Sequence, residues 1–473
     1  MAREGLNSAP PRRLPPRRAA AITSAGRALV AAVPAFLLVF HAAVGSWETR
    51  GATAAAQAAV WAASIGIAHA LGKVGLTALG PRIAVGRGVL FAVINSTALS
   101  VALPSEHHVA TTTLFVAVLV FVGEAAWETF ALRYVSPVVR LLLVGTSGAA
   151  ETLFEDMQRG RTGGYELVGV VVEPDSPPVC DPRIPLQGDV DNLDEVIADL
   201  RPDLVVLAPG LKSPRTLGRL LDAAQAGFRV VQLAEFYEHA FGRVPVADLP
   251  EDWFISVLHL YQRPYLCFVK RTIDLIGASI LILLTLPLYP ILASLTRETG
   301  GSPILGQTRL GEHGRLFTVY KFRTMYAGAE RSGEAVWSTA DDPRVTRTGA
   351  VMRRLRLDEL PQLWNVLRGD MSLVGPRPER PEFHELLSEE VPFWTRRHLV
   401  KPGLTGWAQV RQGYVNSAEA TSTKLSYDLW YVRHRSLTVD LAILLRTALV
   451  VVRGDGAKPA PVTVSRRLAE GRR

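Results

Sequence analysis

The chain carries two neighbouring stretches that dominate its C-terminal half: RRLRLDELPQ at residues 353–362 and GDMSLVGPRPE at residues 369–379. In the first, the adjacent carboxylates of Asp358 and Glu359 follow three arginines. Apolar residues recur after them at helical spacing and predict a helix that Gly369 ends: Leu360, Leu363, Trp364 and Leu367. Asp358 therefore lies at a predicted helix N-terminus, where backbone N–H groups and the helix dipole favour negative charge and attract phosphate.

Taken alone, an Asp-Glu pair has a simpler explanation, in which Asp358 is an N-cap and Glu359 a solvated neighbour. The arginines on both sides favour a phosphate site instead. Arg377 lies between Pro376 and Pro378, and rigid prolines reduce the entropy cost of holding a guanidinium in place.

These stretches resemble the catalytic signature of the monotopic polyprenyl-phosphate phosphoglycosyl transferases, also called the bacterial sugar transferase family. The resemblance extends to KRTID at 270–274, Gln307, Arg309, Gly311, YKFRTM at 320–325, KPGLTGWAQV at 401–410, YDLWY at 427–431 and Asp440. It covers the last two-fifths of the chain closely. The whole chain resembles the large form of the family, which starts exopolysaccharide, O-antigen or capsule repeat units.

The resemblance implies a two-step reaction. Asp358 attacks the β-phosphate of a UDP-sugar and expels UMP, which leaves a phosphosugar on the enzyme. Undecaprenyl phosphate then takes that group and becomes undecaprenyl-diphospho-sugar. Glu359 is expected to hold Mg²⁺ together with Asp358, because oxygen ligands and retained waters suit that ion.

The same resemblance suggests roles for other residues. Expected phosphate ligands are Arg353, Arg377, Lys321 and Arg323, with a structural ion pair left open for the last two. Lys270 and Arg271 are expected either to bind the lipid phosphate or to anchor the chain at the membrane rim, and Asp274, one turn on, to pair with one of them. Asp440 is expected near the site. At 411–414 the chain reads RQGY where many relatives have Asn-Gly-Arg, so the identity of the sugar stays open.

Composition points to a membrane protein. Nearly half of the 473 residues are apolar (48%), and the net charge is +8. No nucleic-acid-binding module is visible, so anionic lipid and phosphate substrates explain the basic charge better than nucleic acid. The only cysteines, Cys180 and Cys267, have no metal-binding spacing and suggest a reducing compartment.

A disordered basic arm (1–24) precedes a predicted transmembrane region (25–135) with four spans. These are Ala28–Trp47, Ala54–Leu71, Val89–Leu103 and Val109–Trp127. Lysine and arginine in the middle loop and after the last span place both on the cytoplasmic side. The fold class predicted for this region is a four-helix transmembrane bundle, and the remaining domains are expected in the cytoplasm.

Residues 136–255 alternate strand and helix signals, which predicts an α/β Rossmann-like domain with a parallel sheet. Gly145 and Gly148 form part of a dinucleotide fingerprint, and Glu173 follows where a ribose-binding acid would lie. Nucleotide binding and a regulatory or scaffolding role both remain open for this domain. The pair Asp189 and Asp191 imitates a metal-binding motif but is better explained as a turn with an N-cap.

Residues 256–473 are predicted to form a monotopic catalytic domain with a re-entrant membrane helix at about 272–296 and surface helices. Pro287 and Pro290 interrupt the apolar run Leu275–Leu295, and both flanks are basic, which favours a bent hairpin over a crossing. Relatives usually break this helix at Ser-Pro, and here Thr285 is expected to supply the hydroxyl. The last apolar stretch, Leu437–Val452, is predicted to be an amphipathic helix.

Two other classes of function were considered. A membrane-bound nucleotide-sugar dehydratase would need a Tyr-x-x-x-Lys pair, which none of the eleven tyrosines forms. A non-catalytic scaffold or regulator of polysaccharide assembly remains the alternative. The expected partners are a UDP-sugar, undecaprenyl phosphate and membrane lipids, with a homodimer left open. The expected location is the bacterial cytoplasmic (inner) membrane, with the catalytic domain on the cytoplasmic face.

Overall fold

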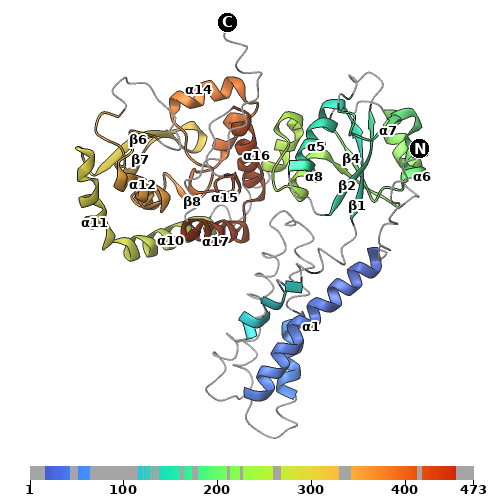
Figure 1. Cartoon of the computed structure of the whole chain (residues 1–473), viewed down its shortest axis with the longest axis horizontal. Coiled ribbons are helices and arrows are strands. Elements are labelled where there is room, and N and C mark those ends of the chain that lie inside the picture. The colour runs from blue at the N-terminus through green and yellow to red at the C-terminus, as the bar shows by residue number, and fades with distance from the viewer. Residues whose placement is uncertain are drawn as a thin grey trace, which may run out of the picture. The chain divides into compact units, whose positions relative to one another are not determined.

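A computed structural model of the chain shows two compact units, Met1–Phe241 and Gly242–Arg473 (Figure 1). The division falls earlier in the chain than the expected boundary between residues 255 and 256. The structure describes residues 16–42, 52–63, 116–120, 122–124, 126–127, 130, 138–159, 164–172, 179, 181–209, 214–223, 227–258, 268–329, 342–412 and 418–453.

The first unit begins with a helical part. Helix α1 (Pro16–Ala42) begins within the predicted disordered arm 1–24, so that prediction is wrong for residues 16–24, which are helical. The helix buries small residues against Trp61 and against a third helical segment; the members of this cluster are Ala31, Ala35, Trp61, Val116 and Val120. Among the described residues, no single helix has both the length and the apolarity required to cross a bilayer. The predicted span Val89–Leu103 and residues 64–71 of the span Ala54–Leu71 lie outside the described residues, so the four-helix transmembrane bundle stays a prediction.

The rest of the first unit is a parallel sheet of five strands in the order β3-β2-β1-β4-β5. The strands are β1 (Val139–Gly145), β2 (Tyr165–Val172), β3 (Leu186–Asp189), β4 (Leu204–Leu207) and β5 (Arg229–Gln232). The helices are α5 (Ser147–Arg159), α6 (Leu193–Leu200), α7 (Pro214–Ala223) and α8 (Leu233–Ala240). This strand order confirms the Rossmann-like prediction.

Strand β1 is buried on both faces because helices cover both sides of the sheet. Leu141 and Leu143 pack with α5 and α8, whereas Leu142 and Val144 pack with α6 and α7. Buried strands of parallel sheets are therefore continuous apolar runs, as this one is.

The glycine-containing turn after β1 leads straight into α5, as expected. A Cβ at Gly145 would collide with Ala208 at the end of β4, whereas one at Gly148 would meet open space. Only the first glycine is thus required by close packing. Glu173 lies outside the described residues. Asp189 accepts a hydrogen bond from the backbone N–H of Asp191, which confirms the turn and N-cap rather than a metal-binding motif.

The second unit begins its membrane-type segment with α10 (Lys270–Thr285), followed by α11 (Leu288–Leu295). Neither helix is long and apolar enough to cross a bilayer by itself. The two segments Lys270–Thr285 and Leu288–Thr299 reach that length and apolarity together, but they meet at a bend of 69°. The predicted break at Pro287 is confirmed. Thr285 Oγ1 does bond a carbonyl, that of Leu281 at 2.7 Å. The carbonyl that loses its usual donor to Pro287, however, is that of Leu283, so the hydroxyl does not replace the missing N–H.

The remainder of the second unit combines one β-hairpin with short helices. The hairpin is β6 (Ile304–Leu310) and β7 (Leu316–Phe322). It is followed by α12 (Arg347–Arg354), the 3-10 turn η10 (Leu357–Glu359), α13 (Gln362–Arg368), β8 (Ser372–Val374), α14 (Pro381–Glu390), the 3-10 helix η11 (Trp394–Leu399), β9 (Gly403–Thr405), α15 (Trp407–Gln412), α16 (Ala418–His434) and α17 (Leu437–Arg453).

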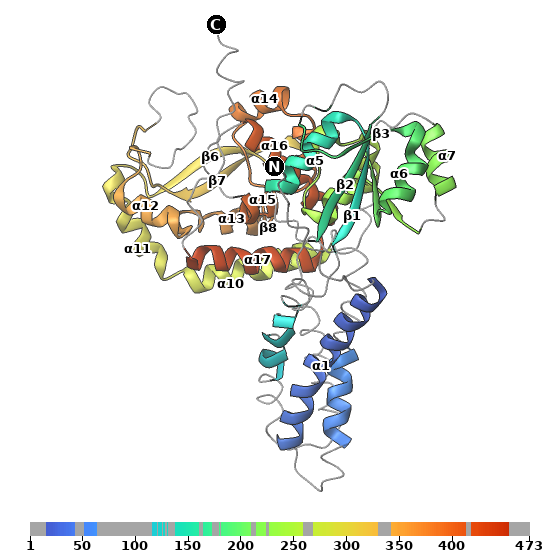
Figure 2. The same cartoon turned by 45° about the vertical axis from the view of Figure 1, so that its right-hand side comes forward.

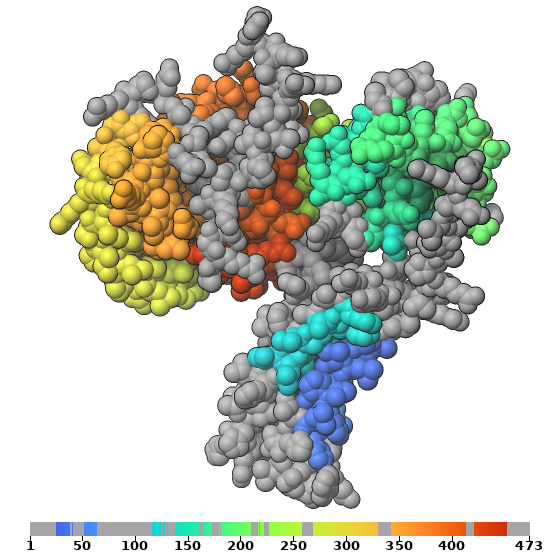
Figure 3. Space-filling view, in the orientation of Figure 1, coloured from blue at the N-terminus to red at the C-terminus, as the bar shows by residue number. Residues whose placement is uncertain are grey.

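Helices α10 and α17 lie side by side in both Figure 1 and Figure 2. Helix α17 is amphipathic, as predicted. Val439, Ala442 and Ile443 are buried, and an exposed stripe at intervals of four residues consists of Leu437, Leu441, Leu445 and Leu449. The atoms of α10 and α11 (yellow) form the outer edge of this unit in Figure 3. Most of the large apolar side chains of α10 and α11 are exposed as well, so this edge of the unit is apolar.

Candidate active site

Asp358 and Glu359 lie in the 3-10 turn η10, between α12 and α13, and are only 8% and 6% exposed. Arg356 begins this turn with φ 58°, ψ 21°, a left-handed conformation that few non-glycine residues adopt. Strained backbone of this kind persists only where its surroundings enforce it, often at functional sites. Here it directs two adjacent carboxylates into the protein instead of into solvent.

Helix α13 follows the pair and ends at Gly369, whose φ of 93° only glycine adopts readily. The helix and its end were predicted correctly, and the structure shows which face is buried. Trp364 is 56% exposed, while Leu363 and Val366 are buried. Polar Asn365 is fully buried because its amide bonds the backbone of β7, at Thr318 (2.7 Å) and Tyr320 (3.1 Å). This amide fixes the acidic pair relative to the hairpin.

Glu359 is held as a carboxylate by two guanidinium groups. Arg377 Nη2 lies 2.8 Å and Arg356 Nη1 3.2 Å from the same oxygen. Burial alone would raise the pKa of Glu359, but Arg377 and Arg356 outweigh it and lower that pKa. Arg377 thus contacts the acidic pair, and its role as a phosphate ligand stays a prediction.

Asp358 is in a different state. Burial, and then the charge of Glu359, raise its pKa to about 6, against the attraction of Arg353 and Lys321. Its buried Oδ1 atom has no hydrogen-bond partner. A buried acceptor without a partner costs free energy, so such atoms point to a functional role or to an absent ligand. Of the two carboxylates, Asp358 is therefore the one available for chemistry.

The hairpin supplies further cations to the same place. Gln307 Oε1 accepts from Arg309 Nη2 at 2.7 Å and from Lys321 Nζ at 3.1 Å. Burial and the neighbouring charge of Arg309 lower the pKa of Lys321 to about 8. Gln307 and Arg309 belong to the resembling segments but had been given no role. Their spacing of two residues could have indicated a shared role, because it puts both side chains on one face of a strand.

The other expected phosphate ligands have separate surroundings. Arg353 donates a hydrogen bond from Nε to Thr324 Oγ1 at 2.8 Å. Its charge also contributes to the positive potential at Asp358. Arg323 donates Nε to the backbone carbonyl of Ser302 at 2.9 Å, so its role toward phosphate stays a prediction.

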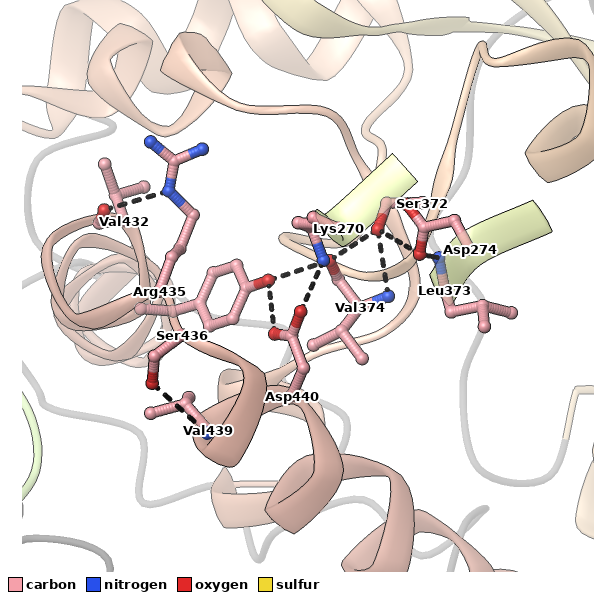
Figure 4. A network of polar contacts seen from close by, with 11 residues as sticks. Lys270, Asp274, Ser372, Leu373, Val374, Val432, Arg435, Ser436, Val439 and Asp440 are labelled. Carbon is pink, nitrogen blue, oxygen red and sulfur yellow. Dashed lines mark hydrogen bonds and ion pairs between the residues drawn. The ribbon is translucent and has the colours of Figure 1, made fainter. Parts of the chain in front are cut away.

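The start of α10 is tied into the fold by three side chains, two of which are shown in Figure 4. Lys270 forms a 2.6 Å ion pair with buried Asp440, and Arg271 donates to the last carbonyls of α13, those of Val366 and Leu367, at 2.7 Å. The expected pairing of Asp274 with Lys270 or Arg271 is wrong. Its Oδ1 accepts instead from Leu373 N and Ser372 Oγ, each at 3.0 Å.

Asp274 bonds inward because a buried carboxylate within an apolar helix needs donors, and strand β8 presents them. Asp440 also accepts from the hydroxyl of Tyr431, at 2.8 Å, so Lys270 and Asp440 are part of an internal network. Their roles toward the substrates, like that of Arg271, stay predictions.

The loop that presents Arg377 packs closely on the segment before β9. Gly375 N donates to Thr405 O (2.9 Å) and Gly403 N donates to Pro376 O (2.8 Å). A Cβ at Gly375 would collide with the backbone of residues 401–403, so only glycine fits. Pro376 and Pro378 flank Arg377 within this tightly bonded loop.

The residues present suit a hard divalent cation. Among the described residues no cluster of three or more His, Cys, Asp or Glu side chains could enclose a metal ion. Mg²⁺, however, is commonly held by one or two carboxylates, with waters and substrate phosphates completing its shell. The unpartnered Oδ1 of Asp358 is an oxygen of the type that such a shell uses. Glu359 is adjacent, although two guanidiniums already engage it.

The arrangement as a whole defines a phosphate-handling site: one available carboxylate, a second one held by arginines, and several cations around them. A family model described as bacterial sugar transferase matches residues 265–454. The sugar transferase EpsL of Bacillus subtilis is 42% identical over 193 residues, which are 40% of this chain and 89% of that protein. The chain belongs to the bacterial sugar transferase family, as its sequence predicted.

Two larger relatives extend the similarity beyond the catalytic unit. UDP-N-acetylgalactosamine-undecaprenyl-phosphate N-acetylgalactosaminephosphotransferase of Aeromonas hydrophila is 40% identical over 266 residues, 56% of this chain and 60% of that protein. UDP-glucose:undecaprenyl-phosphate glucose-1-phosphate transferase of Escherichia coli (strain K12) is 30% identical over 324 residues, 64% of this chain and 66% of that protein. The chain thus spans less than two thirds of either relative.

Proposed function

We propose that this protein transfers a sugar 1-phosphate from a UDP-sugar to undecaprenyl phosphate, giving undecaprenyl-diphospho-sugar and UMP. The observation that carries the proposal is the contrast within the acidic pair. Glu359 is neutralised by two arginines, whereas the buried Oδ1 of Asp358 has no partner and lies close to the charges of Arg353 and Lys321. The names of the two larger relatives support the same substrate classes.

In the proposed mechanism, an oxygen of Asp358 forms a bond to the β-phosphorus of the UDP-sugar, and the bond to the UMP oxygen breaks. The covalent aspartyl-phosphosugar is then attacked by a phosphate oxygen of undecaprenyl phosphate, which releases Asp358 as a carboxylate. Splitting one displacement into two is what a nucleophilic carboxylate offers. Arg353, Arg377 and Lys321 would neutralise the charge on the transferred phosphoryl oxygens.

Asp358, with Glu359 beside it, would hold Mg²⁺ when substrate is bound. When bound, the ion would supply additional charge neutralisation at the diphosphate. The carboxylates would then serve two purposes: Glu359 keeps Arg377 and Arg356 in place, and Asp358 remains able to reach phosphorus.

The apolar edge of the second unit supports a monotopic arrangement at the cytoplasmic face of the inner membrane. The α10–α11 pair is bent by 69° at Pro287, close to Pro290, and α17 beside it exposes four leucines along one stripe. An amphipathic helix in the interface and a hairpin that enters and leaves by one face would bring Asp358 to the level of the lipid phosphate.

The proposed reaction is tested by UMP release. The purified protein in detergent is incubated with undecaprenyl phosphate, Mg²⁺ and a panel of radiolabelled UDP-sugars that includes UDP-glucose, UDP-galactose and UDP-N-acetylgalactosamine. One sugar should give stoichiometric UMP and a labelled lipid product. If no sugar in a broad panel gives UMP or labelled lipid, the chain is better explained as a scaffold of polysaccharide assembly.

The pH dependence of kcat/KM should be bell-shaped. Asp358, whose pKa is about 6, must be ionised to attack, so the rate falls as the pH drops through 6. Lys321, whose pKa is about 8, is cationic only below that value, so the rate also falls above pH 8. Lys321→Arg should remove the alkaline limb because a guanidinium stays charged. Lys321→Met should lose about 10²-fold below pH 8, and its difference from the wild type should shrink above that pH, where Lys321 is itself neutral. An unchanged alkaline limb in Lys321→Arg would contradict this assignment.

The second unit should act without the first. A chain that begins at Gly242 keeps the buried bond from Trp407 Nε1 to the Gly242 carbonyl (2.7 Å) and the one from Val244 N to Ser426 O (3.2 Å). It should retain phosphosugar transfer in detergent. A chain that begins at Trp253 loses both bonds and should unfold several degrees lower, because a buried donor without a partner costs about 1–3 kcal/mol. Complete inactivity of the longer, folded chain would place unit 1 within the active site.

A further inference from the structure

Four consecutive backbone carbonyls around Arg377 are all hydrogen-bonded, each by a different donor. Pro376 O accepts from Gly403 N (2.8 Å) and Glu379 O from Leu310 N (3.0 Å). Pro378 O accepts from Arg309 Nη1 at 3.3 Å. Arg377 O accepts from Arg397 Nη2 at 2.9 Å. This segment therefore has little freedom to shift, and Arg377 itself is held by a buried guanidinium.

Arg397 is 1% exposed and is itself fixed by its surroundings. The same Nη2 atom donates to Asp428 Oδ2 at 2.7 Å, and the guanidinium lies over the ring of Trp394, 4.4 Å from its centroid. A buried guanidinium that is hydrogen-bonded to a carboxylate and stacked on an aromatic ring has little freedom to turn. Its hydrogen bond therefore fixes the position of the backbone carbonyl of Arg377.

A second ion pair completes the cluster around the same loop. Glu379, two residues after Arg377, is bonded by Lys424 and lies 3.6 Å from Arg397 Nη1. Burial would raise the pKa of Glu379, but Lys424 and Arg397 outweigh it and lower that pKa to about 2. The cluster of Arg397, Lys424, Glu379 and Asp428 thus carries two positive and two negative charges that balance.

Stability alone does not explain this cluster. A buried ion pair is often no better for stability than a well-packed apolar pair, because both charges lose their water. What an apolar pair cannot supply is the donor to Arg377 O. At the other end of Arg377, its Nη2 atom lies 2.8 Å from Glu359. A chain of contacts therefore runs from Asp428 through Arg397 and Arg377 to the acidic pair.

We propose that Arg397, oriented by Asp428, is a positioning residue that holds the Arg377 guanidinium where the donor's phosphate binds. The proposal rests on the proposed function and deepens it. Arg397 is not assigned a contact with substrate, and its effect is exerted through Arg377. Because catalysis of phosphoryl transfer is mostly positioning and charge stabilisation, a shift of about 1 Å in such a clamp can cost about 10²-fold in rate.

The test is a double-mutant cycle with four full-length proteins: wild type, Arg397→Lys, Arg377→Ala and the double variant. Lysine keeps a charge for Asp428 but has one nitrogen and a different reach, so kcat/KM should fall at least 10-fold. In the Arg377→Ala background the same substitution should change kcat/KM less than 2-fold, because the group on which it acts is gone. Equal losses in both backgrounds would overturn the proposal, since a structural role adds independently of Arg377.

A second variant guards against simple misfolding. Arg397→Met combined with Asp428→Leu replaces the ion pair by apolar side chains of similar volume, and its Tm should remain near that of the wild type. Its kcat/KM should still fall at least 10-fold, because nothing donates to Arg377 O. Wild-type kcat/KM in this variant would overturn the proposal.

The affinity for UDP, measured by calorimetry on the same four proteins of the cycle, is a readout that does not depend on turnover. If the wild type binds UDP but releases no UMP from any UDP-sugar, the proposed function fails. The positioning role then stands or falls on whether the losses of UDP affinity are non-additive. An additive cycle in an active enzyme would remove the positioning role and leave the proposed function intact.

Discussion

Asp358→Asn is expected to reduce UMP release by at least about 10³-fold while the protein stays folded. The amide keeps the size of the carboxylate but has no charge with which to attack phosphorus. Because the pKa of Asp358 is raised in the folded protein, its ionisation at pH 7 destabilises the folded state relative to the unfolded chain. A neutral asparagine should therefore leave Tm unchanged or raise it slightly at pH 7. The measurement is single-turnover UMP release beside a thermal melt.

Glu359→Gln is the matched control, because it makes the same chemical change one residue away. The pKa of Glu359 is lowered in the folded protein, by Arg377 and Arg356 against the opposing effect of burial. Removing its charge leaves two guanidiniums less well compensated, so this variant should melt at a lower temperature. It should be slower and need more Mg²⁺, but it should still form the labelled enzyme intermediate. Near-normal turnover of Asp358→Asn would sink the nucleophile assignment.

Much of the fold could be predicted because short local sequence patterns determine it. Most strands of the Rossmann-like sheet are short apolar runs separated by turn residues, whereas β3, with the sequence LQGD, is not and was not predicted. The helix after Asp358 stops at the one residue suited to φ 93°, Gly369. The break in the apolar hairpin was predicted from Pro287 and Pro290; it lies at Pro287, whereas Pro290 lies within the first turn of α11. Patterns of this kind need only neighbouring residues, so one sequence is enough to reveal them.

The buried polar contacts could not be predicted in the same way. Asp274 bonds Ser372 across 98 positions of sequence, and Arg397 bonds Asp428 across 31. Helical spacing suggested a nearby cation for Asp274, but a backbone N–H of β8 outcompetes it because an unpaired buried amide is as costly as an unpaired carboxyl. The partner of a buried polar group depends on which groups the fold brings together in its interior. The spacing of residues along the chain does not show this.

Trp364 shows a related difficulty. The spacing of apolar residues predicted the helix but did not show which face is buried, and Trp364 is exposed. The structure buries Asn365 instead, since its amide joins α13 to two backbone groups of β7. A polar residue with satisfied partners can thus displace an aromatic one from a core position.

Replacing Pro287 and Pro290 together by leucine is expected to abolish transfer although every catalytic residue remains. Both prolines lack the N–H that continues a helix, and the bend of 69° between the two helices lies at this point. With leucine, a continuous helix over Leu275–Leu295 would be about 31 Å long, which matches the thickness of the hydrocarbon core. The segment should then cross the bilayer and carry Asp358 to the side that lacks UDP-sugar.

The measurement is labelling of single cysteines in sealed vesicles, with Cys180 and Cys267 first replaced by serine. In the natural hairpin, cysteines at Val269 and Ser302 should be labelled from the same, cytoplasmic side. In the double leucine variant the second cysteine should be labelled only from the opposite side. Leu284→Ile with Ile291→Leu, which keeps both prolines, is the control and should change neither labelling nor activity. Labelling of the natural hairpin from opposite sides would defeat the re-entrant topology, because a crossing there separates Asp358 from its cytoplasmic donor.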